Sequence, residues 1–410
     1  MKVTFHKKNL MKVLGPAAGI PLSKNTYLPC DGLLFECPPD RRFGENPSNA
    51  SDLCRISAFD LDIGLRSVIQ CTIHEKGMCI IPMQTILQIV RALPDGEITL
   101  ETHPNGNAVI SAGKINFRTS VSPGENFPAM PILTGSKTYL ISQHLLQCIL
   151  SETVFAVAHT DTARMGFHNG LVQISGKELT ITGCDNYRLA VSRGIISSDE
   201  ETSEEIKLII PGKFLRELLH LLNDTDEEVA MILGRKHVIF KFGELCFFTR
   251  ILEIEYPDYE KMLPSAYTTQ VYLPRTEFLE AIERSSIIAE AKLGGMGKTH
   301  VKLEFADNTV RISSVSSGGA VEEILSVDMT GTNLTIGFEC RNLLETLKAI
   351  PKECNRLRLR MNTSVMGITI EAAKESPFID SEEKEKTLLP DEKNRFMYYV
   401  LPTRITVPLK

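Results

Sequence analysis

A glycine-rich segment in the last third of the chain has residue types that can bind phosphate. Residues 293–299 read Leu-Gly-Gly-Met-Gly-Lys-Thr, and their end matches a P-loop, whose backbone N–H groups and lysine hold nucleotide phosphates. The complete motif needs a glycine at the position of Lys292. A P-loop also follows a strand and opens a helix, whereas this segment follows a predicted helix and precedes a predicted strand. We therefore expect a connecting loop, and a P-loop NTPase that uses residues 294–299 is kept as an alternative.

Other residues capable of catalysis do not complete a site. His159 and Asp161 could form a metal-binding or acid/base pair, but the sequence shows no second cluster to go with them. Asp60 and Asp185 occupy equivalent places in two internal repeats, and a repeated carboxylate is more typical of a turn or cap. We therefore predict no catalytic residue, no metal site and no cofactor.

The ten cysteines lack the spacing of a metal site. The chain contains no Cys-x-x-Cys pair and no Cys/His cluster. Most cysteines stand in apolar runs, where a thiol packs as a small hydrophobic group. The N-terminus carries charges where a signal peptide needs an apolar region, and nowhere do 18 apolar residues run together. These features predict reduced core cysteines in a cytoplasmic protein that does not enter a membrane.

The net charge of −6 argues at first against a nucleic-acid partner. Much of the acid is concentrated in two segments, however. Residues 199–205 hold five carboxylates and no base, and residues 380–395 hold six carboxylates against four bases. Both segments read as solvated loops. Because the rest of the chain is close to neutral, a locally basic surface is compatible with the composition.

One pattern, a helix followed by a hairpin, occurs three times in the chain. The three helices begin near Pro82, Pro211 and Arg341, at intervals of roughly 129 and about 128 residues. Each has leucines or isoleucines at helical spacing and is followed by two apolar strands, the first pair turning at Asn105-Gly106. A repeat of domain size predicts three similar domains. We place them at residues 1–130, 131–262 and 263–410, the last with a charged insert at 374–395.

The first half of each predicted domain contains a strand and a longer helix. We expect strands at 3–5, 138–141 and 269–273, and helices at 9–14, 142–158 and 276–291, with the first helix broken near Gly15-Pro16. Further strands are expected at 32–36, 54–58, 69–73, 171–175, 179–182, 300–305, 310–314, 322–328, 357–361, 365–371 and 396–401.

Three motifs carry a resemblance to a known family. They are Cys-Asp-Asn-Tyr-Arg-Leu-Ala-Val at 184–191, Tyr-Pro-Asp-Tyr-Glu-Lys-Met-Leu-Pro at 256–264, and Val-Leu-Pro-Thr-Arg at 400–404. With the threefold repeat, they resemble over the whole length the bacterial sliding clamps, the β subunit of DNA polymerase III. The resemblance implies an α+β fold of three DNA-clamp domains, each with two helices on one side and antiparallel sheets on the other, and a homodimer that closes into a ring.

The resemblance also implies a function. A clamp encircles duplex DNA without reading its sequence, is not an enzyme, and gives processivity to the DNA polymerase III catalytic subunit. That subunit, the clamp loader and repair polymerases dock through short linear peptides in a cleft between domains 2 and 3. A scaffold of clamp architecture that binds partners but not DNA is a second alternative.

The resemblance assigns site residues. For the peptide cleft they are His168, Cys184, Asn186, Tyr187, Arg188, Leu189, Pro257, Lys261, Met262, Gly367, Tyr399, Leu401, Pro402, Thr403 and Arg404. Leu189 and Met262 could instead belong to an interdomain core. Asn186 stands where the family usually has glycine, and residues 405–410 extend past the usual family end.

The DNA-facing residues implied by the resemblance are mostly basic: Lys24, Arg91, Arg164, Phe167, Lys213, Arg216, Arg341 and Lys348. Each base could equally be an ordinary solvated side chain. For the dimer interface the resemblance implies Phe117, Ile287 and Ile288, with core burial as the competing interpretation of Phe117.

Overall fold

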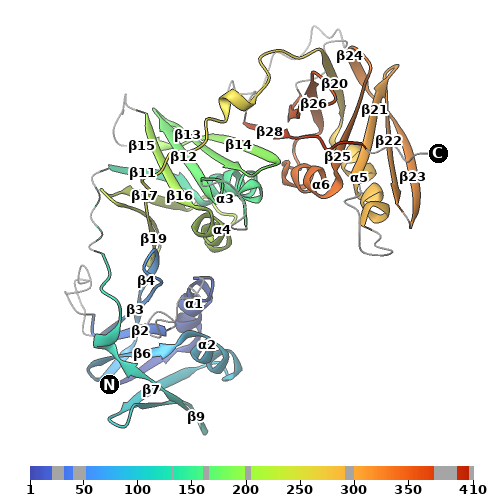
Figure 1. Ribbon diagram of the computed structural model, residues 1–410. Helices are drawn as coiled ribbons and strands as arrows, with labels where there is room; N and C mark the ends of the chain where they lie inside the picture. The colour runs from blue at the N-terminus through green and yellow to red at the C-terminus, as the bar shows by residue number, and fades with distance from the viewer. Residues whose placement is uncertain are drawn as a thin grey trace. The chain divides into compact units, whose positions relative to one another are not determined.

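The computed structural model describes residues 1–20, 32–39, 52–131, 133, 135, 137–159, 166–198, 205–290, 300–316, 318–373 and 395–405. These residues form six α-helices and four antiparallel sheets, so the predicted α+β class is confirmed (Figure 1). Their contacts define two compact units. The first unit contains residues 1–144, 197–200 and 217–251, and the second contains residues 145–196, 201–216 and 252–410. The domain limits given above stay a prediction.

The first unit holds two sheets. One has the strand order β5-β1-β7-β8-β9 and the other the order β10-β6-β2-β3-β4-β19-β18-β17-β11-β15. Helices α1 and α2 pack against each other. The elements are β1 Lys2–His6, α1 Lys7–Ala18, β2 Gly32–Cys37, β3 Leu53–Phe59, β4 Ile63–Gln70, β5 Thr72–Glu75, β6 Gly77–Pro82, α2 Met83–Ala92, β7 Glu97–His103, β8 Asn107–Ala112, β9 Ile115–Ser120, β10 Ser122–Pro123, β11 Lys137–Ser142, β15 Ser197–Ser198, β17 Glu228–Leu233, β18 His237–Phe242 and β19 Leu245–Arg250.

The second unit also holds two sheets, with the orders β16-β12-β13-β14-β28-β27-β26-β20-β24 and β23-β22-β21-β25. Helices α5 and α6 lie side by side (Figure 1). The elements are β12 Asn169–Ser175, β13 Glu178–Cys184, β14 Arg188–Ile195, β16 Ile206–Pro211, β20 Thr269–Pro274, α5 Arg275–Glu290, β21 His300–Ala306, β22 Thr309–Ser316, β23 Gly319–Ser326, β24 Asp328–Gly331, β25 Leu334–Glu339, α6 Cys340–Ala349, β26 Arg356–Met361, β27 Ile368–Ala372 and β28 Phe396–Val400. Helices α3, Gln143–Ser151, and α4, Gly212–Leu221, include residues of both units.

A repeated polar contact supports the threefold repeat. The first residue of α1, α3 and α5 donates its backbone N–H to the loop that follows the second helix of the same repeat. The bonds are Lys7 to Gly96 at 2.8 Å, Gln143 to Glu227 at 2.8 Å and Arg275 to Asn355 at 2.9 Å.

The side chains of the same three residues bind the end of that second helix. Lys7 Nζ donates to the carbonyls of Arg91 and Leu93, Gln143 Oε1 accepts from the N–H of Asn223, and Arg275 Nη2 donates to the carbonyl of Ile350. The last turn of a helix leaves backbone carbonyls unpaired. Lys7 and Arg275 donate to carbonyls at this end, whereas Gln143 accepts from an N–H just after α4.

Two helix predictions are wrong at their ends. Helix α1 does not break at Gly15-Pro16 but continues to Ala18. Pro16 loses one backbone bond, yet Val13, Leu14 and Ala17 stay buried around it, and their packing holds the last turn. Helix α3 ends at Ser151 rather than near 158. There the Thr153 hydroxyl donates to the carbonyl of Ile149 at 2.7 Å, which competes with continuation of the helix.

The predicted turn at Asn105-Gly106 is confirmed, because it joins β7 to β8 and Gly106 has a φ of +76°. The expected strand at 69–73 is instead divided between the end of β4 and the start of β5.

The nine cysteines in the described ranges are free thiols, and each is buried or half-buried. No helix among the described residues is long and apolar enough to span a membrane.

Candidate functional site

The turn between β13 and β14 is built around one carboxylate. The Asp185 N–H donates to the carbonyl of Arg188 at 2.9 Å. Asp185 Oδ1 accepts from the backbone N–H groups of Tyr187 and Arg188, each at 2.7 Å. Aspartate is favoured in such turns because its short side chain bonds its own backbone two residues on. This bonding confirms the prediction that Asp185 is a turn residue, and it presents Asn186 and Tyr187 at the surface.

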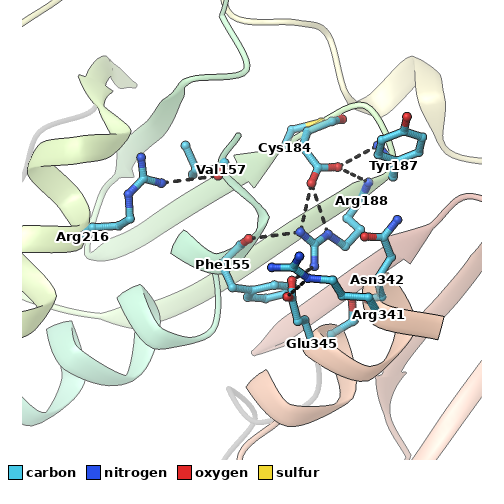
Figure 2. Close-up of polar contacts among 11 residues, drawn as sticks. Phe155, Val157, Cys184, Tyr187, Arg188, Arg216, Arg341, Asn342 and Glu345 are labelled. Atoms are coloured by element: carbon cyan, nitrogen blue, oxygen red, sulfur yellow. Dashed lines mark hydrogen bonds and ion pairs between the residues drawn. The ribbon is translucent and has the colours of Figure 1, made fainter. Parts of the chain in front are cut away.

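Arg188 ties this turn to its neighbours. Its Nε and Nη2 donate to Asp185 Oδ2 at 3.2 and 3.1 Å, its Nη2 also donates to the carbonyl of Phe155 at 3.4 Å, and its Nη1 donates to Glu345 Oε2 at 2.6 Å (Figure 2). The guanidinium lies over the Phe155 ring, 5.4 Å from its centroid. Since the Arg188 side chain is only 8% exposed, these contacts hold the start of β14 in place.

Strand β28 supplies the opposite side of the site. It pairs with β14, which places Tyr399 opposite Leu189 and Val400 opposite Arg188. The next residue, Leu401, donates its N–H to the carbonyl of Tyr187 at 2.8 Å. This bond joins the segment after β28 to the turn before β14.

Gly367 makes room for the Tyr399 ring. Its N–H donates to the Tyr399 hydroxyl at 2.9 Å. A Cβ at position 367 would lie 2.5 Å from the Tyr399 ring, closer than side-chain carbons can approach. We infer that the predicted cleft residue Gly367 acts by allowing the Tyr399 ring to take this position.

A cavity of about 470 Å³ opens between these segments. Its lining is mostly apolar and comes from Phe167, Cys184, Asp185, Asn186, Tyr187, Arg188, Leu189, Met262, Tyr399 and Leu401. Phe167, Cys184, Leu189 and Tyr399 of this lining are buried and belong to one hydrophobic cluster. Tyr187, Met262 and Leu401 are exposed apolar side chains of the lining. An apolar cavity with a few polar groups suits a small apolar ligand or side chain.

Two side chains of the cavity lining, Cys184 and Tyr399, have a raised pKa. Burial raises the pKa of the Cys184 thiol to about 12, with a further contribution from the Asp185 charge. The thiolate is the nucleophilic form of cysteine, so Cys184 is protonated and inert near neutral pH. Burial likewise raises the pKa of Tyr399.

Eight of the predicted cleft residues meet in the cavity lining: Cys184, Asn186, Tyr187, Arg188, Leu189, Met262, Tyr399 and Leu401. The remaining seven, His168, Pro257, Lys261, Gly367, Pro402, Thr403 and Arg404, lie outside that lining. Lys261 is exposed and pairs with Asp258 at 2.7 Å, and the Thr403 N–H donates to the carbonyl of Gly337 at 2.8 Å.

Two lining residues were not assigned to the cleft from the sequence. Asp185 was predicted only as a turn residue. Phe167 was assigned to DNA, but the structure corrects its placement, because its side chain is 4% exposed and packs with the buried cluster. A buried ring cannot reach a phosphate backbone. The sequence feature that could have indicated the burial of Phe167 is the apolar strand β12, which follows it in the chain.

The predicted DNA-facing bases that the structure describes lie on the second helix of each repeat. Arg91 is exposed on α2, Lys213 and Arg216 are half-buried on α4, and Arg341 and Lys348 are exposed on α6. Arg216 donates to the carbonyl of Val157 at 3.4 Å (Figure 2). Lys24 and Arg164 lie outside the described residues.

Two of these arginines influence the same histidine. Burial lowers the pKa of His159, and the positive charges of Arg216, Arg188 and Arg341 lower it further, against an opposing effect of Glu345. Asp161, the suggested partner of His159, lies outside the described residues, and no metal-binding group of three or more His, Cys, Asp or Glu residues occurs within the part of the chain that the structure describes.

The predicted interface residues lie at or beside sheet edges. Half-buried Phe117 is on β9, the edge strand of the five-stranded sheet. Ile287, 70% exposed, is on α5, which contacts β23, the edge strand of the four-stranded sheet. Ile288 lies next to it and approaches Gly319 of β23. The P-loop-like segment 293–299 is outside the described residues.

Comparison with known proteins places these features in a family. Residues 48–131, 140–258 and 260–380 match, in order, the models of the N-terminal, central and C-terminal domains of the DNA polymerase III beta subunit. Among curated relatives, a beta sliding clamp of Staphylococcus aureus is 30% identical over 284 residues, which cover 68% of this chain and 73% of that protein. A beta sliding clamp of Staphylococcus epidermidis is 31% identical over the same shares.

Solved structures share the fold. A putative DNA polymerase III beta subunit from Eubacterium rectale has a TM-score of 0.84 at 22% identity, and the Bacillus subtilis sliding clamp has 0.83 at 24%. A Pseudomonas aeruginosa sliding clamp bound to griselimycin has 0.81 at 23%. In each case the match covers 99% of this chain and 100% of the other.

Proposed function

The chain belongs to the bacterial sliding clamp family, the beta subunits of DNA polymerase III, and on this premise we propose that it encircles duplex DNA as a closed homodimeric ring and tethers partner proteins to it. The partners are the DNA polymerase III catalytic subunit, the clamp loader and repair polymerases. The observation that carries the proposal is the apolar cavity between the β13–β14 turn and the segment after β28, in a chain of three repeats.

Ring closure rests on two sheet edges. Strands β9 and β23 each lie at the edge of a sheet, with hydrogen-bonding groups on one side that can pair with another chain. Exposed Ile287 and Ile324 and half-buried Phe117 supply apolar surface there. A contact between different surfaces of identical chains makes a ring when its rotation closes. We assign Phe117, Ile287 and Ile288 to this contact.

DNA binding needs no base-reading residue in this proposal. A protein held on DNA by encirclement requires only weak, salt-dependent attraction to phosphates. Arg91, Lys213, Arg216, Arg341 and Lys348 supply the positive charge, together with Lys24 and Arg164. The exposure of Arg91, Arg341 and Lys348 to solvent supports this role.

The cavity binds short linear peptides. Its buried lining residues contact apolar side chains of the peptide, and exposed Tyr187, Met262 and Leu401 line it at the surface. The Pseudomonas aeruginosa clamp has been solved bound to griselimycin, and we propose that the same compound occupies this cavity. His168, Pro257, Lys261, Pro402, Thr403 and Arg404 extend the binding surface beyond the lining.

The protein acts without catalysis, in the cytoplasm. The protonated Cys184 thiol supports a binding role for the cavity. The P-loop alternative has a direct test: ATP binding that is lost in Lys298→Ala would support it, and absence of ATP binding would remove it.

Encirclement is tested with circular DNA. We expect the protein, loaded by its clamp loader onto a nicked circle, to stay bound through gel filtration and to run off once a restriction enzyme cuts the circle. An uncut circle carried through the same incubation is the control. Retention that does not change on cutting would support the scaffold alternative instead.

The cleft is tested by the double variant Leu401→Ala with Pro402→Ala. Overlapping synthetic peptides of the cognate DNA polymerase III catalytic subunit identify a binder, and we expect its affinity to fall at least about tenfold in the variant. The dimer mass should stay unchanged. Val365→Ala removes a 78% exposed apolar side chain outside the cavity lining and serves as the control. Equal affinity in the double variant and the control would refute the cleft assignment.

A further inference from the structure

Glu345 binds two arginines, one at the proposed peptide cleft and one proposed to contact DNA. Its Oε2 accepts from Arg188 Nη1 at 2.6 Å, and its Oε1 accepts from Arg341 Nε at 2.7 Å (Figure 2). Arg188 fixes the turn at the cleft. Arg341 lies one turn before Glu345 on α6 and is 74% exposed, which makes it one of the proposed phosphate contacts. One carboxylate therefore connects the cleft with a helix proposed to face DNA.

The contacts of Arg188 extend from Glu345 into the cleft. Arg188 also binds Asp185, which holds the N–H groups of Tyr187 and Arg188, and the Tyr187 carbonyl accepts from the Leu401 N–H. Each link is a hydrogen bond of 3.2 Å or less. Directly bonded neighbours thus connect Glu345 with Tyr187 and Leu401, two exposed residues of the cavity lining.

Little solvent screens these charges on the cleft side. The side chains of Arg188 and Asp185 are 8% and 12% exposed, and Glu345 is 35% exposed. Burial alone would raise the pKa of Glu345, but hydrogen bonds from Arg341 and Arg188 outweigh it and hold that pKa below its ordinary value. The carboxylate is therefore ionised and divided between two cations.

We propose that Glu345 is a positioning residue of the peptide cleft, which orients Arg188 and so fixes the β13–β14 turn, and that an anion bound by Arg341 strengthens this hold. The inference rests on the proposed function, since it requires a cleft that binds peptides and a phosphate near Arg341. A phosphate that engages Arg341 leaves the Glu345 charge to Arg188 alone. The turn is then held more firmly, and peptide affinity rises.

Linkage makes the effect mutual. If DNA phosphate raises the affinity for peptide by some factor, bound peptide raises the affinity for DNA by the same factor. Because Arg341 is exposed and its pairing is screened by solvent, we expect the low end of the usual range, about fivefold.

The experiment uses the full-length protein and two probes, griselimycin and the tightest peptide of the polymerase catalytic subunit. Their affinities are measured by calorimetry with and without a short linear DNA duplex. We expect Glu345→Gln to weaken both probes about tenfold, as for loss of one charged hydrogen bond, and to abolish the gain from DNA. Arg341→Gln should behave as the phosphate-bound state, with tighter probe binding in the absence of DNA and no further gain from DNA.

Glu283→Gln is the matched control. Glu283 lies on α5 and pairs with Lys348 of α6 at 3.1 Å, so its loss removes an equivalent charge without touching Arg188. It should retain the wild-type affinity for both probes in the absence of DNA. The NMR signal of the Arg188 Nε–H should shift in Glu345→Gln and not in Glu283→Gln, at equal melting temperatures.

The outcomes separate this inference from the proposed function. If the wild type binds the probes and Glu345→Gln binds them equally well, or if Arg341→Gln binds them more weakly, the inference fails and the cleft stands. If the wild type binds neither probe, the proposed cleft fails and the inference fails with it.

Discussion

The β3–β4 turn of the first repeat and the β13–β14 turn of the second are closed by the same set of backbone and aspartate hydrogen bonds. In each, an aspartate N–H donates to the carbonyl three residues on, for Asp60 to Ile63 at 3.0 Å and for Asp185 to Arg188 at 2.9 Å. In each, one Oδ1 accepts from the two N–H groups at the far side of the turn. The prediction that both carboxylates are turn residues is confirmed.

In both turns, the residue two positions after the aspartate accepts a backbone hydrogen bond from a neighbouring segment. The Arg250 N–H donates to the Asp62 carbonyl at 3.3 Å, and the Leu401 N–H donates to the Tyr187 carbonyl at 2.8 Å. The side chains at these positions differ, however. The first turn has Asp62 and Arg250, an exposed charged pair at 4.0 Å, and the second has Tyr187 and Leu401, which line the cavity. The comparison teaches that turns closed by the same hydrogen bonds carry a charged pair in one repeat and an apolar pair that lines the cavity in the other.

The fourth residue of each turn differs in the same way. Ile63 is 2% exposed and packs in the apolar interior. Arg188, its equivalent, is bonded to Asp185, Phe155 and Glu345. The fourth residue of the second turn is thus held by charged and polar partners, of which Glu345 and Phe155 lie elsewhere in its unit, whereas Ile63 is held by apolar packing.

The largest effect is expected from Asp185→Ala. It removes two backbone bonds and leaves Arg188 buried beside Glu345 alone, which should cost about 3 kcal/mol in the free energy of unfolding and abolish peptide binding. Urea denaturation and calorimetry measure the two. Asp60→Ala, the matched change, should cost about 1 kcal/mol and leave peptide binding intact. Equal costs at the two positions would contradict the comparison.

A second variant gives the β13–β14 turn the charged pair of the β3–β4 turn. We expect Tyr187→Asp with Leu401→Arg to reduce peptide affinity at least about tenfold, because the apolar lining becomes a charged pair. Both positions are exposed, so the free energy of unfolding should change by less than about 1 kcal/mol. Retained peptide binding in a folded double variant would show that these two side chains do not distinguish the turns.

Glycine substitutions should have opposite effects in the two turns. Leu61 has a φ of +81°, in the left-handed region, and Asn186 does not have a positive φ. We expect Leu61→Gly to stabilise the protein by about 1 kcal/mol, because glycine carries no Cβ penalty there. Asn186→Gly should destabilise it by about 0.5 kcal/mol through added freedom of the unfolded chain. Thermal unfolding measures both, and a stabilising Asn186→Gly would contradict the difference in backbone.

The smallest effect is expected from Arg250→Ala. Its side chain is 57% exposed and that of Asp62 is 68% exposed, and exposed ion pairs contribute about 0.5 kcal/mol or less. The urea midpoint should therefore barely move. A loss above about 1 kcal/mol would mean that the first turn also depends on its charges.

The sequence predicted much of this architecture because apolar periodicity is local. The three helix-and-hairpin units followed from spacing, and eight residues of the cavity lining followed from the resemblance to sliding clamps that three motifs carry. The role of Glu345 did not follow, since its partner Arg188 is 157 residues away and no local pattern links them. The continuation of α1 through Pro16 and the burial of Phe167 were missed for a similar reason. Both depend on packing, and tertiary packing can outweigh local preferences.

The position of β28 in its sheet has a consequence for biosynthesis. This strand lies between β14 and β27, yet it follows both in the chain, and Tyr399 and Leu401 come after every other residue of the cavity lining. Domains generally fold in order as the ribosome makes them. A nascent chain shorter than about 400 residues therefore lacks two residues of the cavity lining, so the cavity is completed only when synthesis has passed this point.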